Sequence, residues 1–236
     1  MIGTTANGDP ARPWRVLPAP RRLGLWLVDL AQPPDRAALA QLTEREWVRA
    51  ARFHNPADRH CYVTAHAAVR GLIAIHCGLA LACQQFDWTI FGKWRLAGAV
   101  GWDFSLSYAG DTALVGIAKG CAVGVDLERR RSIPDARALA RLHFTQRECA
   151  ALAGLSAGDR DAVFLRGWTR KEACVKALGT GLSIGLAAPL TELETGVYDG
   201  CCTARYGDLS VTVGSATMIG PSIGTLIGAW ALVPPQ

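Results

Sequence analysis

The chain has 236 residues, of which half are hydrophobic and 19% are charged, and its formal net charge is +5. This composition is ordinary for a globular protein, and the length suffices for one large domain or two small ones. No run of about 18 apolar residues occurs, so we expect no membrane-spanning helix. The start of the chain lacks a continuous apolar segment with a small-residue cleavage site, and we therefore expect a cytoplasmic protein.

Charge and cysteine content limit the function classes further. A net charge of +5 suits a polyanionic small ligand or an acidic protein partner and does not require nucleic acid. The eight cysteines include no C-x-x-C pair. Zinc ligands or disulfides are one interpretation, but the missing ligand spacing favours small buried side chains in a reducing compartment.

The first half of the chain predicts a mixture of strands and helices. Residues 1–22 carry four prolines and four arginines without an apolar period and predict an irregular arm. Residues 23–30 alternate as a strand does. Thr43 and Glu46 have the spacing of a capping box, which predicts a helix through Phe53. A second helix is predicted from Asn55 and Pro56 to about residue 76. Further strands are predicted over 86–91, 103–108, 112–118 and 121–128.

The second half continues the mixture. A short helix is predicted over 134–142, and Thr145 with Glu148 forms a second capping box for a helix to about residue 153. A longer helix is predicted over 159–178, with Gly179 placed to end it. Residues 191–232 are rich in strand-forming residues and glycine. Strands and helices without strict alternation predict an α+β fold, and the sequence shows no obvious internal repeat.

The predicted strand that ends at Glu128 carries two acids on one face. Side chains alternate along a strand, so Val123, Val125 and Leu127 point into a core while Asp126 and Glu128 point the other way. The two carboxylates are then about 6–7 Å apart along the backbone. A hard divalent cation such as Mg²⁺ would neutralise their repulsion. The alternative is the solvent-facing side of an edge strand, where such pairs are common.

The predicted helix over 159–178 carries an acid on its apolar side. Phe164, Trp168, Glu172 and Val175 follow helical spacing, and Lys176 lies one turn beyond Glu172. A buried carboxylate needs a partner, which a metal site shared with the acidic strand would provide. A simple surface ion pair between Glu172 and Lys176 is the alternative.

Together, these two stretches resemble the 4'-phosphopantetheinyl transferase superfamily, in particular its surfactin-synthetase-activating type. The family pattern is a Gly-[Val/Ile]-Asp-x-Glu strand, followed some forty residues later by Trp-x-x-Lys-Glu-[Ala/Ser]-x-x-Lys and often by Gly-x-Gly-Leu. The matching segments are Gly124-Val-Asp126-Leu-Glu128, Trp168-Thr-Arg-Lys171-Glu172-Ala-Cys-Val-Lys176 and Gly179-Thr-Gly181-Leu182.

Weaker similarities extend the match to about residues 44–182. They are Arg52-Phe53 with Arg59 and Arg70, Phe91-Gly92-Lys93, Phe104-Ser-Leu-Ser107-Tyr108-Ala109-Gly110, and Phe144-Thr145 with Glu148. Tyr108 stands where the family usually has a histidine that contacts a coenzyme A phosphate, and Ala109 stands for a serine. Tyrosine can donate a hydrogen bond but carries no positive charge near neutral pH.

The resemblance implies a fold, a reaction and a set of site residues. The fold would be two similar α/β subdomains that form a pseudo-dimer within one chain, residues 23–118 and 119–236, after the arm of residues 1–22. The reaction would move the phosphopantetheine arm of coenzyme A to a serine of an apo acyl or peptidyl carrier protein, leaving adenosine 3',5'-bisphosphate. The implied metal ligands for Mg²⁺ or Mn²⁺ are Asp126, Glu128 and Glu172. The implied catalytic residues are Glu172, as general base, Lys176 and Asp126. The implied coenzyme A contacts are Arg52, Arg59, Lys93, Ser107, Tyr108 and Lys176.

Other functions remain as alternatives. Tyr108 and Ala109 leave room for a non-catalytic relative that only binds coenzyme A or a carrier protein. The three arginines at 129–131 would suit a nucleic-acid-binding protein, but no RNA- or DNA-binding motif accompanies them. By resemblance, the chain is expected to be a monomer that binds neither nucleic acid nor a membrane and serves secondary metabolism, with the choice of carrier left open.

Overall fold

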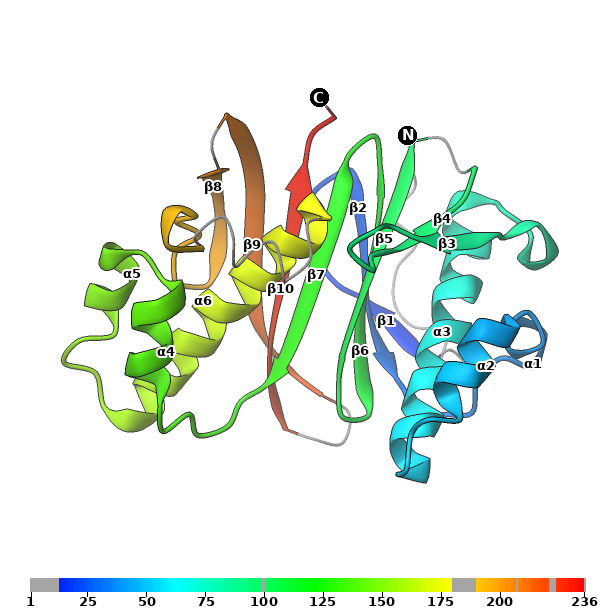
Figure 1. Cartoon of the computed structure of the whole chain (residues 1–236), viewed down its shortest axis with the longest axis horizontal. Helices are drawn as coiled ribbons and strands as arrows, with labels where there is room; N and C mark the ends of the chain where they lie inside the picture. The colour runs from blue at the N-terminus through cyan, green and yellow to red at the C-terminus, as the bar shows by residue number, and fades with distance from the viewer. Residues whose placement is uncertain (1–12, 99–100, 180–189, 207, 221–223, 236) are drawn as a thin grey trace.

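The computed structural model describes residues 13–98, 101–179, 190–206, 208–220 and 224–235. Two four-stranded antiparallel sheets lie next to each other, and a long helix packs on each (Figure 1). The α+β fold with two similar halves is therefore confirmed. Every helix in the described ranges is too short or too polar to cross a bilayer.

The first sheet has the strand order β1-β2-β6-β5. A small hairpin, β3–β4, and three helices accompany it. The elements are β1 (Trp14–Val16), β2 (Leu23–Asp29), α1 (Arg36–Leu39), α2 (Glu44–Ala50), α3 (Pro56–Cys77), β3 (Phe86–Trp88), β4 (Trp94–Leu96), β5 (Trp102–Ala109) and β6 (Thr112–Lys119).

The second sheet has the order β7-β10-β9-β8. Its strands β7-β10-β9 repeat the arrangement of β2-β6-β5 in the first sheet, whereas β1 lies beside β2 and β8 lies beside β9. The elements are β7 (Ala122–Arg129), α4 (Ala136–His143), α5 (Gln146–Ala151), α6 (Ala157–Leu178), β8 (Gly200–Tyr206), β9 (Leu209–Ile219) and β10 (Thr225–Val233). The division of the chain into 23–118 and 119–236 stays a prediction, and the first sheet extends back to β1, before residue 23.

Most predicted elements are present, and the errors concern short segments. Both capping boxes form, and both long helices begin and end within two residues of their predicted ends. The predicted irregular arm is wrong at Trp14–Val16, which pairs with β2; residues 1–12 of that arm lie outside the described residues. The predicted strand over 86–91 ends at Trp88, because Thr89 to Lys93 form the turn into β4, which was missed. The short helix α1 was also missed.

An internal repeat that the sequence did not reveal relates the two halves. Glu46, the acid of the first capping box, is bonded to Arg70 of α3, and Glu148 of the second box is bonded to Lys171 of α6. Arg70 and Lys171 are each the fifteenth residue of a 22-residue helix, and each helix is followed by a glycine in the left-handed conformation. The two halves therefore use the same device to fix a short helix on a long one.

Side chains of β5 join the two sheets. Strand β7 has no backbone partner in its own sheet on the side that faces β5. Three of its N–H groups donate instead to side chains on one face of β5. The pairs are Val123 N to Asp103 Oδ2 at 2.8 Å, Val125 N to Ser105 Oγ at 3.0 Å and Leu127 N to Ser107 Oγ at 3.3 Å. Between the sheets, Val123, Val125 and Leu127 pack in a shared apolar core, as predicted.

Candidate active site

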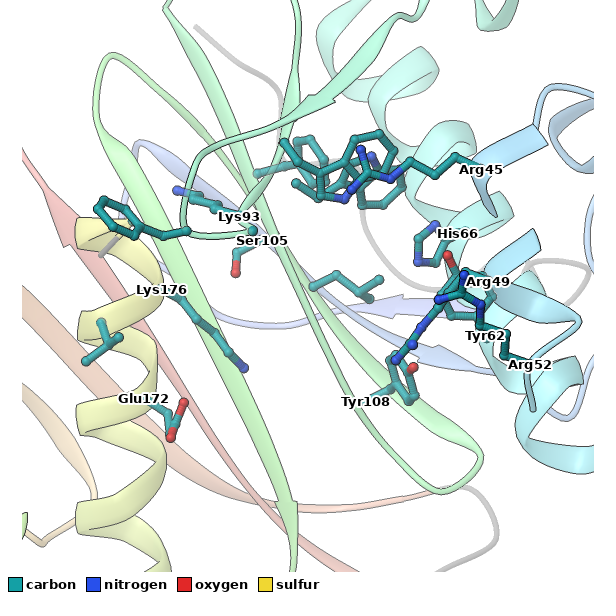
Figure 2. Close-up of a pocket in the computed structure, with 18 of the residues that line it drawn as sticks. Arg45, Arg49, Arg52, Tyr62, His66, Lys93, Ser105, Tyr108, Glu172 and Lys176 are labelled. Carbon is teal, nitrogen blue, oxygen red and sulfur yellow. The ribbon is translucent and has the colours of Figure 1, made fainter. Parts of the chain in front are cut away.

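A cavity of about 830 Å³ lies where the two halves meet. Figure 2 shows Glu172 and Lys176 entering it from α6, and Arg49 and Tyr108 on its opposite side. The cavity is lined by Arg45, Val48, Arg49, Arg52, Tyr62, His66, Trp88, Phe91, Gly92, Lys93, Trp94, Phe104, Ser105, Leu106, Tyr108, Glu172, Val175, Lys176 and Gly179. Five cations and one carboxylate make this lining strongly basic, which suits a polyanionic ligand.

Lys176 is bonded across the junction to Asp126. Its Nζ donates to Asp126 Oδ1 at 2.7 Å and to Ser107 Oγ at 3.2 Å. The sequence suggested a pair between Lys176 and Glu172, but no hydrogen bond or ion pair between these two occurs in the described part of the chain. The nearby sheet explains the difference, because Asp126 on β7 presents a second carboxylate to the same ammonium group.

Glu172 is buried in the wall of the cavity. Burial raises the pKa of its carboxyl to about 7, the charges of Asp126 and Glu128 raise it as well, and Lys176 opposes them. The three acids expected from the two motifs therefore interact electrostatically. A carboxyl with a pKa near neutrality can exchange a proton at physiological pH.

Glu128 is the most exposed of the three acids. Its Oε2 accepts a hydrogen bond from Arg131 at 2.5 Å, and about a quarter of its side chain is exposed. Arg131 thus offsets part of the negative charge at this end of β7. Neither Glu128 nor Asp126 is among the residues that line the cavity itself.

The donor set fits a hard divalent cation, although no three-ligand cluster is preformed among the described residues. Asp126 is 6% exposed, and its Oδ2 is buried without a hydrogen-bond partner. An orphaned carboxylate oxygen costs free energy unless a cation or proton binds it. With Glu172 nearby, this oxygen offers the hard ligands that Mg²⁺ uses together with water and phosphate.

The predicted coenzyme A contacts divide into two groups. Arg52, Lys93, Tyr108 and Lys176 line the cavity. Lys93 is already engaged, since its Nζ donates to Asp103 Oδ2 at 2.5 Å and to the Val123 carbonyl at 3.1 Å.

Arg59 and Ser107 are not part of that lining. Arg59 is exposed near the start of α3. The hydroxyl of Ser107 is bonded to protein groups on β7 and α6. Gly181 and Leu182 of the third motif lie outside the described residues.

Sequence reasoning missed several residues that line the cavity. Arg45 stacks on Trp88 at 4.0 Å from the ring centroid, and Arg49 lies one turn further along α2. A signal was present, because Arg45, Arg49 and Arg52 are spaced so that they share one face of a helix and its end. The partner ring on the hairpin could not be inferred from that spacing.

A buried polar cluster supports this wall of the cavity. Glu46 accepts two hydrogen bonds from Arg70, at 2.8 and 2.6 Å, and one from His66 Nδ1 at 2.6 Å. Burial alone would raise the pKa of Glu46, but these bonds lower it to about 2. Burial lowers the pKa of His66 although the bond to Glu46 opposes this, and the ring stacks on Trp94 at 4.3 Å.

Comparison with known proteins agrees with the motifs. A family model for the 4'-phosphopantetheinyl transferase superfamily matches residues 122–206. The 4'-phosphopantetheinyl transferase HetI of Nostoc sp. strain PCC 7120 is 31% identical over 175 residues, which cover 72% of this chain and 72% of HetI. The chain belongs to this superfamily. Transfer of a phosphopantetheine arm to a carrier protein, the function expected from the motifs, is thereby confirmed.

Two transferases from Bacillus show more limited similarity. The 4'-phosphopantetheinyl transferase psf-1 of Bacillus pumilus is 34% identical over 105 residues, 44% of this chain and 42% of its own. The 4'-phosphopantetheinyl transferase ffp of Bacillus subtilis is 26% identical over 135 residues, 57% of this chain and 59% of its own.

Proposed function

We propose that this transferase depends on Mg²⁺ and uses coenzyme A to modify a serine of an apo acyl or peptidyl carrier protein. The observation that supports this most directly is the arrangement of α6, whose Glu172 and Lys176 line the cavity and whose Lys176 binds Oδ1 of Asp126, a carboxylate that has its other oxygen unpaired. Membership of the surfactin-synthetase-activating type is part of the same proposal.

Asp126, Glu128 and Glu172 are the residues proposed to hold the ion. Mn²⁺ is a plausible substitute, because it accepts the same oxygen ligands. When bound, the ion would neutralise the diphosphate and stabilise the charge that develops on the leaving phosphate.

The reaction is a single displacement at phosphorus. The serine oxygen forms a bond to the phosphorus that carries the pantetheine. The bond from that phosphorus to the oxygen of adenosine 3',5'-bisphosphate breaks, and the serine proton passes to Glu172. Glu172 is proposed for this role as general base because its carboxylate lines the cavity that would receive the serine. Lys176, already within the site, stabilises negative charge on the transferred phosphate.

The cations on the first half are proposed to hold the phosphates of coenzyme A. Arg52 and Lys93 take this role, together with Arg45 and Arg49 on the same wall. Tyr108 would donate a hydrogen bond without adding charge. A basic enzyme surface would also attract an acidic carrier protein, with an association rate that falls as salt is added.

The remaining attributes belong to the same proposal. We infer a cytoplasmic monomer that acts in secondary metabolism, and the eight free thiols agree with a reducing compartment.

The decisive experiment incubates the full chain with coenzyme A, Mg²⁺ and an apo carrier protein and then measures the mass of the carrier. We expect the mass to increase by one phosphopantetheine, and we expect no increase with Asp126→Ala or Glu172→Ala. Several carriers that stay unmodified while coenzyme A binds would favour the non-catalytic relative instead. Turnover retained by both variants would remove the metal assignment.

A further inference from the structure

Ser107 of β5 makes the contact through which the first half reaches both Asp126 and Lys176. Its Oγ donates to Asp126 Oδ1 at 2.9 Å and accepts from Lys176 Nζ at 3.2 Å and from the Leu127 N–H at 3.3 Å. These partners lie on β7 and α6, so one hydroxyl ties three elements together.

The chemistry of the partners fixes the orientation of this hydroxyl. A serine hydroxyl has one hydrogen to donate and two lone pairs to accept with. The ammonium of Lys176 and the N–H of Leu127 can only donate. The single hydrogen of Ser107 must therefore go to Asp126, and both lone pairs are occupied. No capacity remains for a further ligand while these bonds hold.

We propose that Ser107 is a positioning residue that holds the Asp126 carboxylate with its Oδ2 directed to the divalent cation. Oδ1 is bound by both Ser107 and Lys176, which leaves Oδ2 as the oxygen without a partner. Residues that orient a metal ligand in this way typically change metal affinity about 10–100-fold when they are removed. The inference rests on the proposed function, because it assumes a cation bound at Asp126.

Ser105 provides a matched control on the same strand. It lies two residues before Ser107, faces the same way, and accepts a hydrogen bond from the Val125 N–H at 3.0 Å. No bond from Ser105 to Asp126 or Lys176 occurs among the described residues. Ser105→Ala and Ser107→Ala each remove the partner of one β7 N–H, so both should lower the melting temperature, and Ser107→Ala should lower it further because it also loses the bonds to Asp126 and Lys176.

The test measures Mn²⁺ binding to the full chain by electron paramagnetic resonance, without substrate. We expect the dissociation constant to rise about 10–100-fold in Ser107→Ala and to stay within about threefold of wild type in Ser105→Ala. Ser107→Thr keeps the hydroxyl and should restore the affinity. The Mg²⁺ concentration that gives half-maximal transfer should shift in parallel.

The outcomes separate this inference from the proposed function. If wild type binds no Mn²⁺, the metal assignment fails and Ser107 loses its role with it. If wild type binds Mn²⁺ and Ser107→Ala binds it equally well, only the positioning role is overturned. An equal loss in Ser105→Ala and Ser107→Ala would also overturn it, because general loosening of β7 would then explain both.

Discussion

Gly124 of β7 lies so close to Ala173 of α6 that a methyl group on its Cα would meet the Ala173 carbonyl oxygen at 1.9 Å. That oxygen is a backbone atom of a helix and cannot rotate away. Any side chain at position 124 would therefore push α6 off the sheet. Because β7 carries Asp126 and α6 carries Glu172, this close packing sets the spacing across the site.

Gly124→Ala should lower the free energy of unfolding by roughly 1–3 kcal/mol, the usual cost of overpacking. Transfer activity should fall even at temperatures where the variant stays folded. Chemical denaturation checks the stability. Gly158→Ala is the matched control, since an added Cβ there meets nothing within 4 Å and it lies in the first turn of α6. It should be neutral or stabilising by up to about 1 kcal/mol. Wild-type stability and activity in Gly124→Ala would contradict the close-packing argument.

Glu172→Gln should stabilise the metal-free protein at pH 8. Burial and neighbouring acids raise the pKa of Glu172 from 4.5 to about 7, so the folded state binds this proton more tightly than the unfolded state. The protonated carboxyl of Glu172 is fully compatible with the fold below pH 4.5, and this stability is lost as the pH rises through about 7 and the group ionises. This change in pKa corresponds to about 3 kcal/mol of stability that the wild type loses at pH 8. A neutral glutamine at position 172 avoids that loss.

Thermal unfolding at pH 8 and pH 4.5 checks this prediction. The advantage of the glutamine variant should shrink at the lower pH, where wild-type Glu172 is protonated. Added Mg²⁺ should raise the melting temperature of wild type more than that of the variant. Glu194→Gln serves as the control for loss of a charge, at a side chain that is 45% exposed and paired with the exposed Arg147. A variant less stable than wild type at pH 8 would show that ionised Glu172 is not a source of strain.

Local signals in the sequence were sufficient for most of the fold. Thr43 with Glu46 and Thr145 with Glu148 predicted two helix starts because a capping box depends only on residues three apart. Strand β1 and the second strand of the hairpin were missed because each has only three residues and depends on pairing with a neighbouring strand. Short strands carry too little pattern of their own.

The internal repeat is hard to recognise in the sequence because the two halves differ at the positions of the site. Residues 23–28 read Leu-Gly-Leu-Trp-Leu-Val, and residues 123–128 read Val-Gly-Val-Asp-Leu-Glu, with the same glycine and the same alternation. Gly71 is the sixteenth residue of α3, as Glu172 is of α6. The first half thus has Trp26, Val28 and Gly71 where the second has Asp126, Glu128 and Glu172.

The motifs predicted the acids of the site but not its contacts across the chain. Alternation placed Asp126 and Glu128 on one face, and helical spacing placed Glu172 on the buried side of α6. Neither rule could show that Lys176 binds Asp126, since these residues are 50 positions apart. That contact depends on how α6 packs on β7, which only the folded chain defines.

Acid should destabilise the protein partly through Glu46. The folded pKa of Glu46, about 2, lies below its value of 4.5 in the unfolded chain. Its contribution is therefore present above pH 4.5 and is lost as the pH falls toward 2. Buried His66 adds to the loss of stability in acid below about pH 6.5. Its pKa is lowered in the folded state, so the unfolded state takes up the proton first.

Glu46→Gln should be less stable than wild type at pH 7 by about 3 kcal/mol, because it also leaves the buried Arg70 without its carboxylate. The stability of the variant should vary less between pH 4.5 and 2.5. Urea unfolding over this range checks both expectations. Glu44→Gln, exposed in the first turn of the same helix, is the control and should change stability little. Parallel pH profiles of wild type and Glu46→Gln would contradict the assignment.

Tyr108→His should strengthen coenzyme A binding in a pH-dependent way. Tyr108 lines the cavity near Arg49 and Arg52 (Figure 2), and burial raises the pKa of its hydroxyl, which keeps it neutral. A histidine titrates near pH 6.5 and adds a positive charge below it. The KM for coenzyme A should therefore fall about 3–10-fold at pH 6 and stay unchanged at pH 8.

Two controls identify which phosphate of coenzyme A the histidine at position 108 contacts. Tyr108→Phe removes the hydroxyl without adding a titrating group, so any change in KM should be the same at pH 6 and pH 8. Dephospho-coenzyme A lacks the 3'-phosphate, and a benefit of histidine that disappears with this substrate would assign the contact to that phosphate. A benefit that persists would assign it to the diphosphate, because only those charges remain. If the KM of Tyr108→His is the same at both pH values, position 108 contributes no charge to binding, and the arginines on α2 and after it suffice without it.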